Sequence, residues 1–290
     1  MRFIFSKWVI GVILLFLIVG GFIVFRNTST EREEEKIVTP VGPKDTLIGR
    51  SVEGREINAR TYGTGPTHLV FVGGIHGGYE WNSVLLAYEA IDYFDSRPDM
   101  IPDDLSVTII PVANPDGLFA VVGTEGRFLI TDAIGAENQE SGRFNANEVD
   151  LNRNFDCKWQ KESSWKGKTV SAGESAFSEP EAVALRDFLL KAKPKAVVFW
   201  HSQANAVYAS ECEDGILPAT RTTMNAYAKA AGYPAVDEFD AYTVTGDAEG
   251  WLASVGIPAI TVELKTHDAI EWERNLAGVD ALFTLFSVAK

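Results

Sequence analysis

Residues 68–80 read HLVFVGGIHGGYE, and this stretch decides the fold class that we expect for the chain. Its first part, residues 68–75, is a short apolar run that closes on glycines, which is typical of a buried strand. From residue 80 to residue 97, apolar side chains recur at helical spacing. The sequence therefore predicts a strand that leads directly into a helix.

The same alternation continues along the chain. Three more apolar runs predict buried strands, at residues 107–112, 196–200 and 259–264. Helical spacing predicts helices at residues 180–192, 219–231 and 275–289. This order favours an α/β fold with a mixed, mostly parallel central sheet and helices on both faces. Because ligands bind beyond the carboxyl ends of strands in such folds, polar residues there are the first functional candidates.

Composition limits the classes of partner. The 290 residues include 26 basic and 40 acidic side chains, which gives a net charge of −14. Such a surface repels phosphate backbones, so nucleic acid is not expected as a partner. The hydrophobic content of 46% is that of a globular protein and excludes a largely disordered chain.

The N-terminal segment predicts a membrane anchor. Residues 8–25 contain no charge and are flanked by Lys7 and Arg26, and a helix of this length nearly spans a roughly 30 Å hydrocarbon core. The positive charges before it predict that residues 1–7 are cytoplasmic and that the chain after Arg26 is extracytoplasmic. A cleaved signal peptide, which would give a secreted protein, is the alternative. The apolar run is long for that, and no small-x-small cleavage site follows it.

After this segment we expect a tether and one domain. Residues 26–45 are polar, with a run of glutamates and two prolines, which predicts a solvated tether. Residues 46–290 contain no internal repeat and are predicted to form a single catalytic domain. Outside the cytoplasm, oxidising conditions would permit Cys157 and Cys212 to form a disulfide.

Four residues near predicted strand ends have the composition of a metal site. His76 and His201 each follow a predicted strand, and His76 and Glu80 are four apart, so their side chains can point to one side. Two imidazoles and one carboxylate are the ligands of a catalytic zinc that keeps a position for water. Glu263 lies inside an apolar strand, where a carboxylate needs a partner such as metal-bound water.

Several short segments, in this order, resemble the zinc metallocarboxypeptidases of the carboxypeptidase A/B type. They are GRSVEGR at 49–55, GIHG at 74–77, NPDG at 114–117, VDLNRNF at 149–155, FSEPE at 177–181, WHS at 200–202 and VEL at 262–264. The resemblance runs from Gly49 to the carboxyl terminus and implies the fold of that family.

The resemblance implies a metal centre. His76, Glu80 and His201 would hold one Zn²⁺, and Glu263 would be the general base that activates water. One departure from the family pattern concerns the first two ligands, which are separated by one residue more than in the family. Two adjacent glycines between them could absorb the extra residue, and if they do not, Glu80 is misplaced.

The resemblance also assigns residues around the metal. Asp150 would accept a hydrogen bond from the imidazole of His76 and fix its ring. Arg143 would polarise the scissile carbonyl, with Arg127 as the alternative. Asn152 and Arg153 would bind the terminal carboxylate of the substrate, for which a guanidinium offers bidentate contacts.

A tyrosine and a glutamate before the predicted base complete the implied site. Tyr242 resembles the family's mobile tyrosine that closes over bound substrate, and an ordinary surface tyrosine is the alternative. Glu249 occupies the place of the floor of the specificity pocket, where it would favour lysine, arginine or a diamino acid such as diaminopimelate. Glu249 could instead be an exposed residue near a helix start, where the helix dipole favours acids.

The resemblance implies a zinc-dependent metallocarboxypeptidase that hydrolyses C-terminal amide bonds of peptides by metal-activated water. We expect a monomer that is active without removal of a propeptide and that prefers basic or diamino-acid residues. Three alternatives remain open. They are a peptidoglycan-peptide amidase that cuts next to diaminopimelate in muropeptides, a succinylglutamate desuccinylase- or aspartoacylase-like deacylase, and a binding module or pseudoenzyme that keeps the fold without chemistry.

Overall fold

In a computed structural model that describes residues 42–135 and 139–288, the stretch at 68–80 forms a strand and a turn that lead into a helix. The strand is β3 (Thr67–Val72), the turn is the 3-10 segment η1 (Gly77–Glu80), and the helix is α2 (Trp81–Ser96). The predicted strand-to-helix unit is therefore present. Between β3 and η1, the glycine-rich loop carries His76 out of the sheet.

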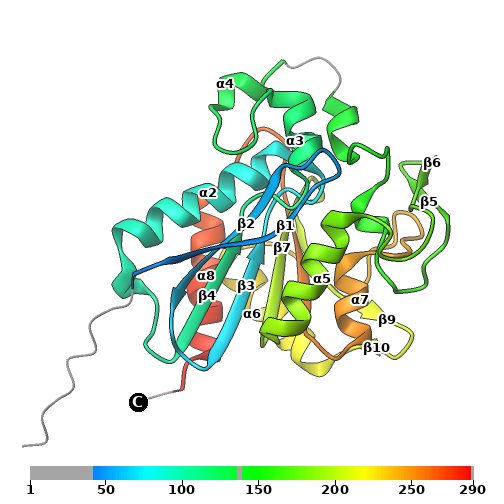
Figure 1. Ribbon diagram of the computed structural model, residues 1–290. Helices are drawn as coiled ribbons and strands as arrows, with labels where there is room; N and C mark the ends of the chain where they lie inside the picture. The colour runs from blue at the N-terminus through cyan, green and yellow to red at the C-terminus, as the bar shows by residue number, and fades with distance from the viewer. Residues whose placement is uncertain (1–41, 136–138, 289–290) are drawn as a thin grey trace, which may run out of the picture. The chain divides into compact units, whose positions relative to one another are not determined.

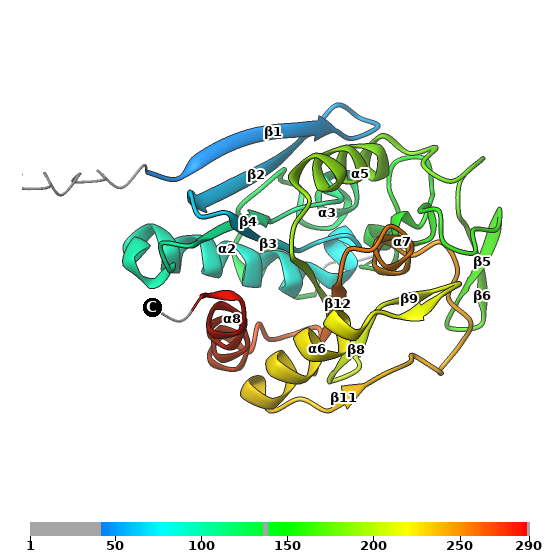
Figure 2. The same ribbon diagram turned by 90° about the horizontal axis from the view of Figure 1, so that it is seen from below.

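Eight strands form one sheet in the order β1-β2-β4-β3-β7-β12-β8-β11, of which Figure 1 labels β1 to β4 and β7 and Figure 2 labels β8, β11 and β12. Besides β3, they are β1 (Lys44–Arg50), β2 (Glu56–Gly63), β4 (Leu105–Ile110), β7 (Ala196–Ser202), β8 (Ala206–Ala209), β11 (Ala235–Val236) and β12 (Ala259–Leu264). The four central strands β4, β3, β7 and β12 are parallel to one another, and β11 is parallel to β8. Strand β1 is antiparallel to β2, β2 is antiparallel to β4, and β8 is antiparallel to β12. The prediction of an α/β fold with a mixed, mostly parallel sheet is confirmed.

Helices cover both faces of this sheet (Figure 2). Helices α2, α6 (Pro218–Ala231) and α8 (Trp272–Phe286) pack on one face, and α5 (Pro180–Ala192) and α7 (Ala248–Ser254) on the other. Successive residues of β3 point to opposite faces, as strand geometry requires. Leu69 and Phe71 join the core under α2, whereas Val70 and Val72 join the core under α5. Burial on both sides explains why the central strands are continuous apolar runs.

The remaining elements are short. They are α3 (Pro115–Val122), α4 (Ile130–Ala133), η2 (Pro98–Met100), η3 (Gln139–Arg143), η4 (Leu151–Arg153), the hairpin of β5 (Glu162–Trp165) with β6 (Lys168–Ser171), and the hairpin of β9 (Glu211–Cys212) with β10 (Gly215–Ile216). A disulfide joins Cys157, after η4, to Cys212 in β9, with Cα atoms 6.0 Å apart. This bond ties the loop after η4 to the β9–β10 hairpin.

The predicted cytoplasmic tail (residues 1–7), the anchor (residues 8–25) and most of the tether lie outside the described residues. Strand β1 begins at Lys44, two residues before the start that we predict for the catalytic domain at residue 46. Within residues 42–135 and 139–288, none of the helices combines the length and the apolar character needed to cross a bilayer.

Buried carboxylates connect the turn at residues 51–55 to helices α3 and α5. Asp116 in α3 accepts hydrogen bonds from Oγ of Ser51 at 2.6 Å and from Nη1 of Arg55 at 2.7 Å. Glu181 in the first turn of α5 accepts from the backbone N–H of Val52 at 3.1 Å. These contacts fix α3, on which the metal-site turn η1 packs.

Stability should depend on the ionisation of Glu181. Burial raises the pKa of Glu181 to about 7, although hydrogen bonds from its own backbone, Val52 and Asn145 oppose the shift. Because the pKa is raised above its unfolded value, the contribution to stability is full below pH 4.5 and is lost as the pH rises through 7. As the pH is raised from 5 to 8.5, the unfolding free energy of Glu181→Gln should therefore rise by about 2.5 kcal/mol relative to that of the wild type. Urea unfolding at the two pH values measures this difference, and an equal pH response of both proteins would contradict it.

Candidate metal centre and active site

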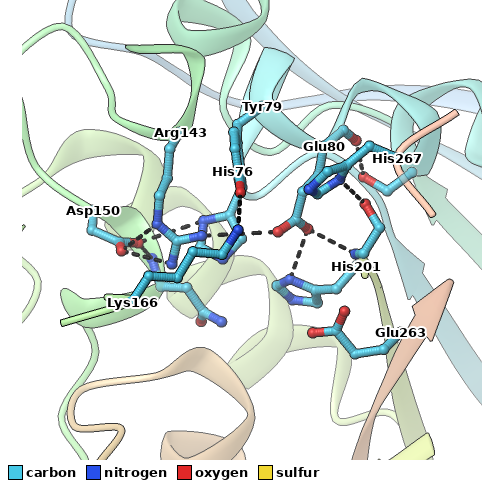
Figure 3. A network of polar contacts seen from close by, with 12 residues as sticks. His76, Tyr79, Glu80, Arg143, Asp150, Lys166, His201, Glu263 and His267 are labelled. Atoms are coloured by element: carbon cyan, nitrogen blue, oxygen red, sulfur yellow. Dashed lines mark hydrogen bonds and ion pairs between the residues drawn. The ribbon is translucent and has the colours of Figure 1, made fainter. Parts of the chain in front are cut away.

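His76, Glu80 and His201 converge near the carboxyl ends of the neighbouring strands β3 and β7 (Figure 3). Each side chain offers one ligand atom, and the three atoms lie within 4.8 Å of one another. All three residues are buried, and the centroids of the two imidazole rings are 5.0 Å apart. Two imidazoles and one carboxylate that meet in this way fit Zn²⁺ with a position left for water. The three predicted ligands are therefore positioned to bind a metal ion.

The turn η1 accommodates the extra residue between His76 and Glu80. Gly77 has a φ of +45°, a left-handed conformation that glycine adopts without strain. A Cβ atom on Gly78 would lie 2.5 Å from Cβ of Val121 in helix α3, so both glycines permit a close approach to that helix. The turn directs the Glu80 carboxylate back toward the histidines.

Gly77→Ala should displace Glu80 and weaken metal binding. An alanine Cβ here would lie 2.6 Å from the carbonyl oxygen of Gly142, and the positive φ is strained for an L-residue. We expect a loss of about 2 kcal/mol of unfolding free energy together with reduced zinc content, from urea denaturation and metal analysis. Gly126→Ala is the control, because the nearest atom to its Cβ, Oη of Tyr88, is 3.4 Å away. Equal zinc content in Gly77→Ala and Gly126→Ala would show that the conformation of this turn is not needed for metal binding.

Carboxylates flank both ring nitrogens of His201. Nδ1 lies 3.1 Å from Oε2 of Glu80, and Nε2 lies 3.1 Å from Oε1 of Glu249. Nδ1 is therefore the nitrogen that faces the other two ligands, while Glu249 holds Nε2. Burial lowers the pKa of His201, but Glu80 and Glu249 together outweigh burial and raise it well above the usual value. A carboxylate on the second nitrogen of a metal-binding histidine fixes the ring and makes it a stronger ligand.

Asp150 lies between His76 and Arg143. Its Oδ1 is 3.5 Å from Nδ1 of His76, and its Oδ2 accepts a hydrogen bond from Nε of Arg143 at 2.8 Å. Nη1 of Arg143 is 3.8 Å from Oε1 of Glu80, so this guanidinium borders the metal site. Burial lowers the pKa of His76 well below its usual value, and the charge of Arg143 adds to the shift. The lowered pKa favours the neutral imidazole, which is the form that binds a metal ion.

Of the two arginines considered for carbonyl polarisation, the structure brings Arg143 to the site and leaves Arg127 on the surface. The Arg127 guanidinium pairs with both carboxylate oxygens of Asp92 in helix α2, at 2.6 and 2.8 Å. This exposed salt bridge holds Arg127 outside the cavity described below. The alternative assignment of the oxyanion role to Arg127 is therefore not supported.

Glu263 stands beside His201 on the neighbouring strand. The two residues are paired in the parallel register of β12 and β7, and Figure 3 shows the Glu263 carboxylate facing the metal-site cavity. Its Oε2 accepts a hydrogen bond from the backbone N–H of Ala204 at 3.2 Å. Burial, followed by the charge of Glu80, raises the pKa of Glu263 to about 7. A carboxyl group with this pKa can both accept and return a proton near neutral pH.

Asn152 and Arg153, in η4, face the same cavity from the side of helix α7. Oδ1 of Asn152 accepts from the backbone N–H of Ala248 at 2.8 Å, which leaves the amide nitrogen available. Arg153 donates to the carbonyl oxygens of Asn152 and Ser164, at 2.5 and 3.3 Å. Within the described part of the chain its buried guanidinium pairs with no carboxylate, and its Nε has no hydrogen-bond partner. A buried cation of this kind can receive a substrate carboxylate.

Tyr242 and Glu249 also line this cavity. Tyr242 is half-buried and packs on Phe239 with ring centroids 4.8 Å apart, so it is not an isolated surface tyrosine. Glu249 is only 2% exposed, which excludes the alternative of an exposed residue near the start of a helix. One of its oxygens contacts His201 and also accepts from Oγ1 of Thr261 at 3.1 Å. The other oxygen is buried without a hydrogen-bond partner among the described residues.

The side chains form one cavity of about 430 Å³. It is lined by nine of the predicted site residues, namely His76, Glu80, Arg143, Asn152, Arg153, His201, Tyr242, Glu249 and Glu263. Asp150 lies behind this surface and is fully buried. The arrangement brings a metal-ligand set, a carboxyl group with a raised pKa and unpaired cationic donors within reach of one small molecule.

The structure adds residues that sequence reasoning missed. Tyr79 and Lys166 line the cavity, and Nζ of Lys166 donates to Oη of Tyr79 at 2.7 Å. The ring of His267 packs against Tyr79, and Nδ1 of His267 is 2.6 Å from Oγ of Ser202. Signals existed for two of them, because Tyr79 directly precedes a ligand and His267 is one of only four histidines. No sequence pattern pointed to Lys166, which reaches the cavity from a separate hairpin.

Two curated proteins are similar to this chain. Gamma-D-glutamyl-L-diamino acid endopeptidase 1 of Lysinibacillus sphaericus is 26% identical over 242 residues, which cover 76% of this chain and 60% of that protein. Murein peptide amidase A of Vibrio campbellii is 31% identical over 156 residues, which cover 50% of this chain and 59% of that protein. The chain thus spans about 60% of the length of these relatives.

A solved structure and a family profile agree with these likenesses. Bovine thrombin-activatable fibrinolysis inhibitor, in complex with tick carboxypeptidase inhibitor, superposes with a TM-score of 0.68 at 20% identity. The match covers 84% of this chain and 90% of the bovine chain and shows the common fold. The family profile described as zinc carboxypeptidase matches residues 44–271, which include all three metal ligands. On this match and the geometry of its site, the chain belongs to the zinc carboxypeptidase family.

Proposed function

We propose that this protein is a zinc-dependent peptidase that hydrolyses the amide bond before a residue with a free carboxylate. The observation that supports this most directly is the convergence of His76, Glu80 and His201 in one cavity with Glu263 and the unpaired guanidinium of Arg153. The first three supply a metal site, Glu263 can transfer protons, and Arg153 selects the end of a peptide. A binding module would not need this combination.

Each residue of the site has a separate role in the proposed hydrolysis. Zinc, when bound, supplies a Lewis acid that polarises the substrate carbonyl and makes a coordinated water more acidic. Glu263 accepts a proton from the attacking water and returns it to the leaving nitrogen, so the C–N bond breaks to give a carboxylate and an amine. The guanidinium of Arg143 stabilises the charge that develops on the carbonyl oxygen. Asn152 and Arg153 hold the carboxylate of the leaving residue.

The proposed substrates are peptides or muropeptides whose leaving residue is basic or a diamino acid. Glu249 and Asp247 line the cavity close to the carboxylate-binding pair, and these carboxyl groups favour a cationic group on the leaving residue. The names of the two curated relatives include a diamino-acid endopeptidase and a murein peptide amidase, which supports this substrate class. A peptide ending in lysine and a γ-glutamyl-diaminopimelate peptide are therefore the first substrates to assay.

Metal analysis and a substrate panel test the proposal. The full chain is purified in detergent and assayed with peptides that end in lysine, phenylalanine or glutamate, with a γ-glutamyl-diaminopimelate peptide, and with N-acyl amino acids. We expect one zinc per chain and hydrolysis of the lysine or diaminopimelate peptide, lost on chelation and restored by zinc. Turnover of N-acyl amino acids alone would favour the deacylase, and zinc binding without any turnover would favour the pseudoenzyme.

We also propose that the protein is a monomer anchored by residues 8–25 with its catalytic part outside the cytoplasm, or secreted if that segment is removed. The uncharged segment and the disulfide between Cys157 and Cys212 support this location. Fractionation should place the full chain with the membrane, and external protease should reach its C-terminal part. Recovery of the reduced protein from the cytoplasm would contradict the proposal.

A further inference from the structure

Lys166 lines the active-site cavity and forms no salt bridge within the described residues, although its charge contributes to lowering the pKa of the nearby Glu140. It stands at the turn of the β5–β6 hairpin, and its ammonium group donates to Oη of Tyr79 at 2.7 Å. It forms no ion pair with any residue in the ranges 42–135 and 139–288. Lys168, on the same hairpin, instead pairs with Glu140 at 2.7 Å. Because Lys166 is exposed and lines the cavity, its ammonium group is accessible to an anionic ligand.

Aromatic rings hold this ammonium group in place. Nζ of Lys166 lies 5.4 Å from the ring centroid of Tyr79 and 5.5 Å from that of Trp165. The Tyr79 ring is itself packed between Trp165 and His267, with centroid distances of 5.1 and 4.8 Å. Cation–π contacts position the ammonium group but do not neutralise it. Figure 3 shows Lys166 extending past Arg143 toward the Tyr79 hydroxyl.

The contacts place Lys166 and Tyr79 on the Glu80 side of the metal site. Tyr79 directly precedes the ligand Glu80 in η1. Asn152, which is proposed to bind the carboxylate of the leaving residue, instead contacts the start of helix α7. Arg153 links the two regions, because it donates both to Asn152 and to the carbonyl oxygen of Ser164 in β5. With the leaving residue near α7 and the scissile carbonyl at the metal, we place the acyl part of the substrate on the Tyr79 side of Glu80.

These two side chains can donate to one anion. Because Oη of Tyr79 accepts a hydrogen bond from Lys166, the phenolic proton is free to point elsewhere. The ammonium group of Lys166 also has donors left after this bond. Charge-assisted hydrogen bonds from such a pair favour a carboxylate over a neutral amide of the same shape.

We propose that Lys166 and Tyr79 bind a carboxylate on the acyl-side residue of the substrate. The preferred substrate is then an amide whose acyl residue carries a free carboxylate close to the scissile bond, as a γ-linked glutamyl residue does. This specificity rests on the proposed peptidase function and narrows its substrate class. The word gamma-D-glutamyl in the name of one curated relative agrees with the chemistry that the cavity offers.

Binding to a variant that cannot turn over substrate tests the specificity directly. The test uses a Glu263→Gln background with zinc added. Titration calorimetry compares the Kd of γ-D-glutamyl-lysine with that of an analogue in which the α-carboxylate of the glutamyl residue, not that of lysine, is replaced by a carboxamide. We expect the carboxylate to bind about tenfold more tightly. Lys166→Met, which keeps the length of the stem, should abolish this preference, and Lys168→Met should keep it. The preference should also shrink with added salt, because the ammonium group is exposed.

Hydrolysis rates give a second readout that separates this inference from the proposed function. With Glu263 intact, the kcat/KM ratio of the two peptides should fall about tenfold in Lys166→Met and stay unchanged in Lys168→Met. The inference would be overturned if Lys166→Met and Lys168→Met had the same kcat/KM ratio for the two peptides and the same Kd preference for the carboxylate. This holds even if both peptides are hydrolysed. If the wild type hydrolyses neither peptide, the proposed function fails, and the calorimetric comparison still decides whether Lys166 recognises a carboxylate.

Discussion

Glu263→Gln should lower kcat by about 10³-fold or more and leave zinc content unchanged. An amide of the same size cannot accept a proton from water at neutral pH, and positioned proton transfer contributes roughly 10²–10⁴-fold to such reactions. Glu263 is not among the three residues positioned to bind the metal, so the ion should remain. The loss corresponds to about 4 kcal/mol in the activation barrier. Steady-state kinetics with the peptide that proves best in the panel, together with metal analysis, measures both effects.

The control is Glu273→Gln, an exposed substitution in the first turn of helix α8. It should change neither activity nor zinc content. If Glu263→Gln kept more than a tenth of the wild-type kcat with zinc bound, proton transfer by Glu263 would be excluded and another residue of the cavity would have to act as the base.

Glu80→Gln should lower zinc affinity by more than 100-fold. The substitution removes the single negative charge among the three ligands, and a neutral amide is a poor ligand for zinc. Loss of partners that only orient metal ligands already costs about 10–100-fold, so loss of a ligand should exceed that range. Competition with a fluorescent chelator measures the affinity, and activity should recover in part at high zinc concentration.

Glu89→Gln provides the matched control, because Glu89 is exposed on helix α2 of the same segment. Its zinc affinity should equal that of the wild type. Unchanged affinity in Glu80→Gln would show that the glycine turn does not deliver this carboxylate to the metal, and the metal site proposed for this chain would then lack its acidic ligand.

The central strands were predictable because each is an apolar run buried on both faces. Strands β4, β3, β7 and β12 lie within two or three residues of the predicted runs, and helix α5 coincides with its prediction at Pro180–Ala192. The outer strands β1, β2, β8 and β11 had no comparable signal. Strand β2 alternates between exposed and buried residues over residues 56–59 and then loses the alternation, and β11 is only two residues long. Neither pattern is long enough to predict a strand with certainty from the sequence.

The metal site was predictable for a different reason. The carboxyl ends of neighbouring parallel strands meet at one edge of the sheet, so His76 and His201 had to lie near each other once β3 and β7 were adjacent. The sequence favoured Arg143 for the oxyanion role and kept Arg127 as the fallback, because residues 118–148 are hard to align with the family. The structure separates them through partners that are distant along the chain, Asp150 for Arg143 and Asp92 for Arg127.

The sequence by itself determined which chemical groups make up the metal site and which strands carry them. Local apolar patterns suffice for this, because they show where a buried strand runs and where it ends. Tertiary structure alone decided that Glu80 turns back to His201, that Glu249 contacts the second nitrogen of that ring, and that Lys166 reaches Tyr79. These contacts join segments 48 to 121 residues apart in the chain, where no local pattern records which side chains meet. Their geometry follows from how the sheet, the helices and the β5–β6 hairpin pack together.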